Sequence, residues 1–364
     1  MKLDTFIKNI KDKWSRKWFE HLLAYEEKGL AWYAISQNPN LTWKVVTEYP
    51  DKPWQWDRMG SNPNITLQII EANPDKPWDW FFISRNPNIS LNYVIQHPKY
   101  AWNWASLSYN SSITMEEIKA HPELEWDWYS MSHHPNLSQE VLEQHLDENW
   151  NWECISCHKN IKFEFMMAHP DLPWKWNSVS RNPNVSWKMI QDNPHLPWNP
   201  VGWSMNPNIT MDIILANLEA RWPGFWISFN PNITPEDIDA NPTFPWSMMG
   251  ISRNPNLTST FILRNLHQTF DWEAIALNSN LMLIDLRVID WINWNIDNLC
   301  QNTWDKNRNL YFQQHIRDFM ASRKIQRWWL NIKFDPKTTL GKKHMMKLYD
   351  DNFGEEGAIT KMEL

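Results

Sequence analysis

Glycine is scarce in this chain of 364 residues, which contains only 8. Folds rich in β-strands use glycine in many tight turns, and loops that cradle phosphate groups use it to bring the backbone close to the ligand. The shortage argues against a β-rich fold and nearly excludes a phosphate-binding loop. A mostly helical protein is the better expectation.

Cysteine and long apolar runs are also in short supply. The three cysteines, Cys154, Cys157 and Cys300, form an odd and sparse set that fits a reducing compartment. The N-terminal stretch MKLDTFIKNIKDKW mixes charged and apolar residues, and no later window approaches the ~18 apolar residues of a membrane span. We expect a cytoplasmic protein that is not secreted and has no membrane partner.

Signatures of catalysis are missing as well. The sequence holds no nucleophile elbow and no recurrent pair of acidic residues, and its Asp and Glu are scattered over variable positions, as on a solvated face. We therefore expect no enzyme activity, no catalytic or metal-binding residue and no cofactor.

Tryptophan, by contrast, is abundant, and it recurs together with asparagine in a strict period. The chain has 28 Trp, which excludes a disordered protein because disordered chains are poor in aromatic residues. The residue that opens an Asn-Pro-Asn-like triplet recurs every 24 residues, at Asn38, Asn62, Asn86, Asn110, His134, His158, Asn182, Asn206, Asn230, Asn254, Asn278 and Asn302. A fixed period of this length indicates a repeat array.

A pair of tryptophans keeps the same phase as the triplet. Its first member runs from Trp54 to Trp294, and its second member is replaced in three consecutive repeats, at Pro200, Gly224 and Met248. We expect both columns to lie in the core between repeats. A fully buried aromatic side chain contributes at most roughly 4 to 6 kcal/mol. The three replacements are positions at which to look for a partner.

Each unit predicts two short helices. In NITLQIIEANP, Thr66 suits an N-cap and Pro74 ends a helix of about two turns. In DKPWDWFFISRNPNIS, Pro77 suits the first turn of a second helix, Trp78 to Ser84, and Ser90 caps the next one. Helices this short are unstable alone, so neighbouring repeats must hold them.

The pattern RNPNITxxxIxxNPxxPWxW resembles the tryptophan-rich repeat proteins of mimivirus-like giant DNA viruses. It is also similar to the bacterial variant leucine-rich repeat, in which 24-residue units alternate an α-helix with a 3-10 helix in a right-handed superhelix. The resemblance covers roughly Ala31 to Asn302 and implies no catalytic residue. If it holds, the protein is viral and acts in the host cytoplasm or a viral factory.

The predicted fold is therefore an all-α, right-handed solenoid of about eleven 24-residue two-helix repeats. Residues 1–30 are expected to form an N-terminal cap helix region, residues 31–303 the helical repeat array, and residues 304–364 a basic helical C-terminal tail with an acidic end.

Charge is distributed unevenly over these parts. Lys306 to Lys347 hold eleven Lys and Arg against two Asp, a net of +9, and Leu348 to Leu364 net −4, so the preceding residues net −12 of the total of −7. The tail sequence RKIQRWWLNI resembles a short basic-aromatic helix common near the C-termini of giant-virus proteins, and loosely an IQ motif.

Three patterns mimic functional sites. The string CISCH, Cys154 to His158, matches a haem attachment motif, but repeat phase explains it and no second cysteine pair completes a zinc site. The ladder His97, His121, His145 and His169 shares its column with Asn and Tyr, which favours a role at helix C-termini. The N-x-Ser/Thr sequons from Asn40 through Asn256 are more simply turn Asn followed by a helix N-cap.

The leading functional hypothesis is a non-catalytic scaffold for protein–protein interaction, since loop-free repetition makes a long surface without a cleft. The candidate partner-binding residues lie on variable columns of the first helices: Lys44, Gln68, Asn92, Glu116, Glu140, Lys188 and Asp212.

Two alternatives remain open. The tail could bind RNA or single-stranded nucleic acid through cationic and stacking groups. These groups are Arg323, Lys324, Arg327, Trp328 and Trp329. The same tail helix could instead dock its aromatics on the last repeat. A structural component of a virus particle is the other alternative function.

Overall fold

The computed structural model describes residues 3–280, 296–334 and 343, and within those ranges all regular structure is helical. The chain divides into two compact units, Lys11–Arg308 and the pair of chain ends, Met1–Ile10 with Asn309–Leu364. The expected all-α repeat solenoid is confirmed, and it occupies the first of these units. The boundaries between the units fall inside helix α1, Leu3–Leu23, and near the start of helix α25, Asp305–Phe334.

Each repeat supplies a first helix after its Asn-Pro-Asn turn and a second helix that begins at the second position of its Trp pair. The described first helices are α3 (Trp43–Glu48), α5 (Leu67–Glu71), α7 (Leu91–Gln96), α9 (Met115–Ala120), α11 (Gln139–Gln144), α13 (Phe163–Ala168), α15 (Trp187–Asp192), α17 (Met211–Ala216), α19 (Pro235–Ala240) and α21 (Ser259–Arg264). The second helices are α2 (Trp32–Gln37), α4 (Trp56–Met59), α6 (Trp80–Ser84), α8 (Trp104–Ser108), α10 (Trp128–Met131), α12 (Trp152–Ser156), α14 (Trp176–Ser180), α16 (Pro200–Ser204), α18 (Gly224–Phe229), α20 (Met248–Ser252), α22 (Trp272–Leu277) and α24 (Ile296–Gln301). A 3-10 turn, η1 (Glu26–Lys28), precedes α2.

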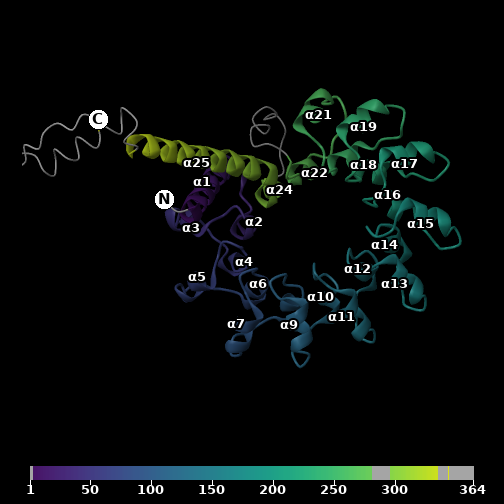
Figure 1. The fold of residues 1–364 in the computed structure, drawn as a ribbon, viewed down its shortest axis with the longest axis horizontal. Helices are drawn as coiled ribbons and strands as arrows, with labels where there is room; N and C mark the ends of the chain where they lie inside the picture. The colour runs from purple at the N-terminus through teal and green to yellow at the C-terminus, as the bar shows by residue number, and fades with distance from the viewer. Residues whose placement is uncertain (1–2, 281–295, 335–342, 344–364) are drawn as a thin grey trace, which may run out of the picture. The chain divides into compact units, whose positions relative to one another are not determined.

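Within Lys11–Arg308 the second helices form an inner layer and the first helices an outer layer (Figure 1). Contacts join second helices from one repeat to the next, as between α2 and α4 or α22 and α24. The exposed side chains of the inner layer therefore lie on helices that are direct neighbours.

The first Asn of each triplet bonds consecutive repeats through its side chain. In a representative rung, Asn206 Nδ2 donates to the carbonyl oxygens of Ser180, Asn182 and Val185 in the preceding repeat, at 3.0, 3.0 and 2.9 Å. Its Oδ1 accepts the Asn208 N–H of its own turn at 2.8 Å. Because the side chain is fully buried, water cannot replace these partners, and an unpaired buried group costs about 1–3 kcal/mol. We call this set of twelve Asn and His side chains, from Asn38 to Asn302, the Asn ladder.

The Asn ladder continues from the last repeat into the first. Asn38 Nδ2 donates to the carbonyl oxygens of Cys300 and Asn302 at 2.9 and 3.1 Å, which are equivalent to the bonds that Asn206 makes to Ser180 and Asn182. The second Asn of the triplet also joins the first repeat to the last, because Asn40 Nδ2 donates to the Thr303 carbonyl at 2.7 Å. Helix α24 contacts α2 as well as α22. The twelve rungs are thus joined head to tail into a closed array, a finding beyond the sequence-based expectation of an array with two ends.

Residues Lys11–Leu23 of α1 pack onto the first repeat of the closed array. The Phe19 ring lies 6.3, 5.0 and 5.4 Å, centroid to centroid, from the rings of Trp32, Tyr49 and Trp54. Phe19 is fully buried by these contacts. This part of the predicted cap region therefore belongs to the core of the array.

Tryptophans of neighbouring repeats meet at right angles. Trp152 and Trp174 have centroids 5.2 Å apart and an interplanar angle of 88°, the edge-to-face geometry that aromatic pairs prefer. Trp174 Nε1 also donates to the His169 carbonyl at 2.9 Å, which satisfies a free carbonyl at the end of α13. The Trp pairs lie between repeats as predicted, but both columns include members that are only half-buried, such as Trp78 in the first column and Trp152 in the second.

The second helix begins two residues later than predicted. Helix α6 starts at Trp80 rather than Trp78, because the Asp79 side chain caps the Phe81 N–H at 2.8 Å. Ser90 caps the following helix as expected, whereas Thr66 occupies the N-cap position without a side-chain capping bond.

The contact between the last repeat and the first, which Asn38 makes, is the seam of the closed array. Closure predicts that Asn38 contributes as much to the free energy of unfolding as an internal member of the Asn ladder. Replacing Asn38 by Ala should lower the free energy of unfolding by about 1–3 kcal/mol, as should the matched Asn206→Ala, because each leaves buried carbonyl groups unpaired. Chemical denaturation followed by circular dichroism measures both variants. A negligible effect of Asn38→Ala beside a clear effect of Asn206→Ala contradicts the closed array.

Candidate functional site

All of the first-helix residues predicted to contact a partner are exposed on the outer layer. They are Lys44, Gln68, Asn92, Glu116, Glu140, Lys188 and Asp212. Each occupies the second position of its helix, so the residues recur along the array without converging on one point. Two of them form ion pairs with neighbours, Glu140 with Lys119 at 2.7 Å and Lys188 with Asp192 at 2.9 Å.

The predicted tail site lies on helix α25. Lys324 is exposed. The backbones of Arg323, Arg327, Trp328 and Trp329 belong to the same helix, and their side chains lie outside the described residues. The acidic end from Leu348 also lies outside them.

Each of the three replacements in the second Trp column opens a second helix, as the Trp does in other repeats. Pro200 opens α16 behind the Asn199 cap, and Met248 opens α20 behind the Ser247 cap. Gly224 opens α18, and a Cβ there would lie 2.0 Å from the Pro245 carbonyl oxygen. Close approach of the next repeat therefore explains the glycine.

The histidine ladder lies at the C-termini of first helices, as its column predicted. The Nδ1 atoms of His97 and His169 lie 2.9 and 3.0 Å from the carbonyl oxygens of Tyr93 and Phe165, one turn back in the same helices. Asn217 makes the equivalent bond to the Ile213 carbonyl at 2.7 Å. Among the described residues, no group of three His, Cys, Asp or Glu side chains could hold a metal ion.

A run of arginines between aromatic rings crosses the first four second helices. The Arg58 guanidinium lies 5.4 Å from the Tyr33 ring centroid and 5.3 Å from that of Phe82. Arg85 lies 5.7 Å from Phe81 and 5.3 Å from Tyr109. Since Phe81 and Phe82 also touch edge to face, the six side chains on α2, α4, α6 and the end of α8 form one continuous strip, which we call the Arg–aromatic strip.

The two arginines of the strip have no carboxylate partner within the described part of the chain, where they form neither an ion pair nor a hydrogen bond to Asp or Glu. Two other arginines on the inner layer are paired, Arg181 with Glu153 at 3.9 Å and Arg253 with Asp271 at 2.7 Å. The strip therefore presents guanidinium groups that are held by rings and remain open to an external anion.

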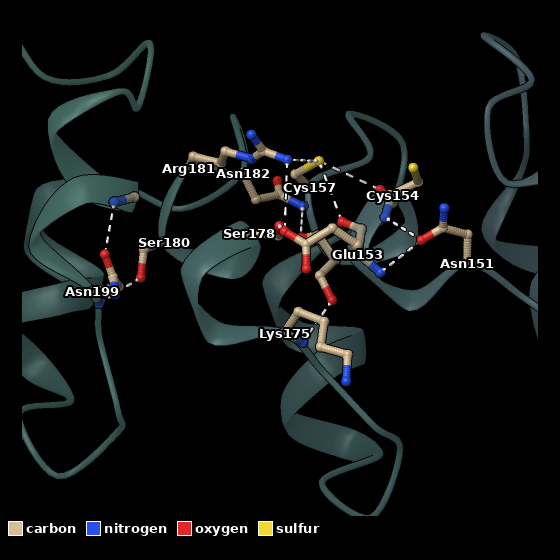
Figure 2. Close-up of polar contacts among 12 residues, drawn as sticks. Asn151, Glu153, Cys154, Cys157, Lys175, Ser178, Ser180, Arg181, Asn182 and Asn199 are labelled. Atoms are coloured by element: carbon tan, nitrogen blue, oxygen red, sulfur yellow. Dashed lines mark hydrogen bonds and ion pairs between the residues drawn. The ribbon is translucent and has the colours of Figure 1, made fainter. Parts of the chain in front are cut away.

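A second cluster surrounds the two cysteines of CISCH. Cys154 Sγ lies 3.0 Å from His133 Nε2 of the preceding repeat. Figure 2 shows Arg181 of the following repeat reaching toward the other thiol, with its NH2 group 3.5 Å from Cys157 Sγ. Arg181 also pairs with Glu153, which accepts a hydrogen bond from the Ser178 hydroxyl.

The surroundings of Cys154 favour its protonated thiol form. Burial, aided by the neighbouring Cys157, raises the pKa of the Cys154 thiol, so Cys154 stays protonated at neutral pH. Cys300, in the seam of the closed array, is fully buried, and burial raises its pKa to about 11. The thiols of Cys154 and Cys157 are the ones that solvent reaches, because both are partly exposed.

The last residue of CISCH is a rung of the Asn ladder. His158 Nε2 donates to the His134 carbonyl at 3.0 Å, and its Nδ1 accepts the Asn160 N–H at 3.2 Å. His134 bonds the preceding repeat in the same way, 3.2 Å from the Asn110 carbonyl. Both ring nitrogens of His158 are thus engaged as in the other members of the Asn ladder, which confirms the repeat-phase interpretation of this histidine.

Two features of the inner layer escaped the sequence analysis. The Arg–aromatic strip and the His133–Cys154 contact both depend on contacts between different repeats, such as Arg58 with Phe82. The signal was present as columns: Tyr33 and Phe81 share one column, and Arg85, His133 and Arg181 share another. Comparing neighbouring columns of consecutive repeats would have predicted that these side chains lie close together.

Comparison of the chain with protein-family models, with curated proteins and with solved structures finds no match. None of the described helices combines the length and the apolar character that crossing a membrane requires.

The two ladder histidines predict a pH-dependent stability. Loss of hydration on burial lowers the pKa of His134 and His158 below the ordinary value of 6.5, so the unfolded chain binds more protons than the folded one between the lowered pKa and 6.5. Stability is therefore full above about pH 6.5 and falls as the pH drops below it. Thermal unfolding between pH 7.5 and 5 measures the fall.

The double variant His134→Asn, His158→Asn restores the residue found at the other ten rungs and should flatten this profile. His267→Asn, outside the ladder, is the control. Equal slopes for the wild type and the double variant would contradict the assignment.

Proposed function

We propose that the protein is a non-catalytic scaffold that binds a protein partner through the inner layer of its repeat array. The Arg–aromatic strip is the observation that carries this proposal. Arg and aromatic residues are enriched at the energetic centres of protein interfaces, where truncating one such side chain can cost about 2 kcal/mol or more of binding free energy. In the strip, Tyr33 and Phe81 are 37% and 41% exposed, so much of their apolar surface is open to a partner.

The outer layer is the weaker candidate surface. Its predicted contact residues are Lys, Glu, Asp, Gln and Asn, and Lys, Glu and Asp are depleted from interface cores. The pairs of Glu140 with Lys119 and Lys188 with Asp192 are exposed, and such pairs contribute little.

The open arginines favour a partner segment with acidic side chains beside apolar ones. A guanidinium binds a carboxylate through two parallel hydrogen bonds, and Arg58 and Arg85 are held in place by rings on both sides. Apolar side chains of the partner would cover Tyr33 and Phe81. The resemblance of the repeat to giant-virus proteins supports the proposal that this encounter occurs in an infected host cell.

The double variant Arg58→Ala, Arg85→Ala should weaken capture of the partner by at least about tenfold, because each change removes a guanidinium from the centre of the strip. The matched control Lys44→Ala, Lys188→Ala removes the same charge from the outer layer and should leave capture unchanged. Quantitative affinity purification with mass spectrometry from the native infected cells compares the two. If the partner is lost with Lys44→Ala, Lys188→Ala and not with Arg58→Ala, Arg85→Ala, the binding surface lies on the first helices instead.

A second candidate function is binding of RNA or single-stranded nucleic acid by the tail. The basic residues between Lys306 and Lys347, with a net charge of +9, support it, whereas the net −12 of Met1–Asp305 disfavours nucleic-acid binding by the array. A structural role in a virus particle has a weaker basis and would be marked by stable self-association.

Deleting Arg323–Leu364 tests the tail. The deletion should abolish binding of a labelled single-stranded RNA, measured by fluorescence anisotropy, and binding by the full chain should weaken steeply as salt rises. RNA binding that survives the deletion contradicts the tail as the site.

A further inference from the structure

We propose that Cys154 and Cys157 are a modification site, a thiol pair on the inner layer that hydrogen peroxide converts to a reversible disulfide. The proposal is independent of the Arg–aromatic strip and of any partner.

The repeats themselves show that the fold does not require these cysteines. The column of Cys154 holds Ser130 and Ser178 in the adjacent repeats, and the column of Cys157 holds His133 and Arg181. Serine has nearly the same shape as cysteine, and the other side chains are much larger, so packing does not select a thiol at either place. Two thiols nonetheless fall in one repeat, on a single turn of chain.

The backbone holds the two cysteines within reach of each other. The Cys157 N–H donates to the Cys154 carbonyl at 3.2 Å, which closes a four-residue turn at the end of α12. Such a turn keeps the first and fourth Cα atoms within about 7 Å, and disulfides span about 4.4–6.8 Å between Cα atoms. Because α12 ends at Ser156, Cys157 lies at its C-cap and can adjust without breaking a longer helix.

The neighbouring repeats supply a different group to each sulfur. Arg181 NH2 lies 3.5 Å from Cys157 Sγ, a contact that strengthens once the sulfur is a thiolate. His133 Nε2 lies 3.0 Å from Cys154 Sγ and can accept its proton when Nδ1 carries the ring hydrogen. Glu153 balances part of the Arg181 charge at 3.9 Å (Figure 2). This asymmetry assigns Cys157 as the attacking thiol and Cys154 as the resolving thiol.

The reaction proceeds in two balanced steps. The Cys157 thiolate attacks one oxygen of hydrogen peroxide and the O–O bond breaks, which yields a sulfenic acid and hydroxide that takes up the proton lost by the thiol to become water. Cys154 then transfers its S–H proton to His133, its sulfur bonds to Cys157 Sγ, and the S–OH bond breaks. The departing hydroxide recovers that proton as a second water. The two sulfurs together lose two electrons, the peroxide gains them, and an external dithiol reverses the change.

The test uses the full chain with Cys300→Ala, which removes the third thiol and has a precedent in Ala276 of the same column. One equivalent of peroxide should remove both thiols, lower the intact mass by two hydrogen atoms, leave the protein unaltered in size on gel filtration, and be reversed by dithiothreitol. Loss of thiols through dimers, or a gain of oxygen on both sulfurs without a disulfide, overturns the proposal.

Single variants assign the two roles. In that background Cys154→Ser should accumulate a sulfenic acid on Cys157 that dimedone traps, whereas Cys157→Ser should react with peroxide at least about tenfold more slowly. His133→Gln should slow disulfide closure without changing the first step. Serine occupies both columns elsewhere, in Ser178 and Ser61, so the variants should fold, and matching circular dichroism spectra check this. Equal trapping in both serine variants contradicts the assignment.

Discussion

The buried side chain of the first triplet residue is the interaction on which the array depends. The side-chain amide bonds in two directions, as Asn206 illustrates. Its NH2 group donates to unpaired carbonyl oxygens at the end of the preceding second helix and in the turn after it, and its oxygen accepts an N–H of its own turn. Helix ends are where backbone groups lack partners, and helices of four to six residues are mostly ends. Short helices can therefore form a stable body only if each end is satisfied from the next repeat.

Serine provides a second bond of this kind. The Ser84 hydroxyl donates to the Trp80 carbonyl within its own helix at 2.7 Å and accepts the Asn103 N–H of the following repeat at 3.0 Å. With Asn and Ser committed to the backbone and the Trp pairs to packing, few columns of the second helix remain free. The Arg–aromatic strip and the thiol pair both lie on those free columns.

Much of the local structure could be predicted from the sequence, because period, turn and cap are local properties. The 24-residue phase identified the inter-repeat tryptophans, the helix-terminal role of His97 and the rung at His158. Closure could not be predicted, since it depends on the small angle between repeats, which accumulates over the whole chain and which no single unit encodes. The candidate sites were missed for a related reason: the contact of Arg58 with Phe82, like that of His133 with Cys154, joins different repeats.

Closure also has a consequence for how a gene encoding such a protein can change. Repeat genes usually gain or lose whole units by unequal recombination, and an open array tolerates this because a new unit only moves the end. Here Asn38 bonds directly to the repeat of Asn302, so an added or deleted unit must either break that seam or alter the angle at every other interface. The copy number of the unit is therefore under direct structural selection, and length variation should be confined to the segments outside the closed array.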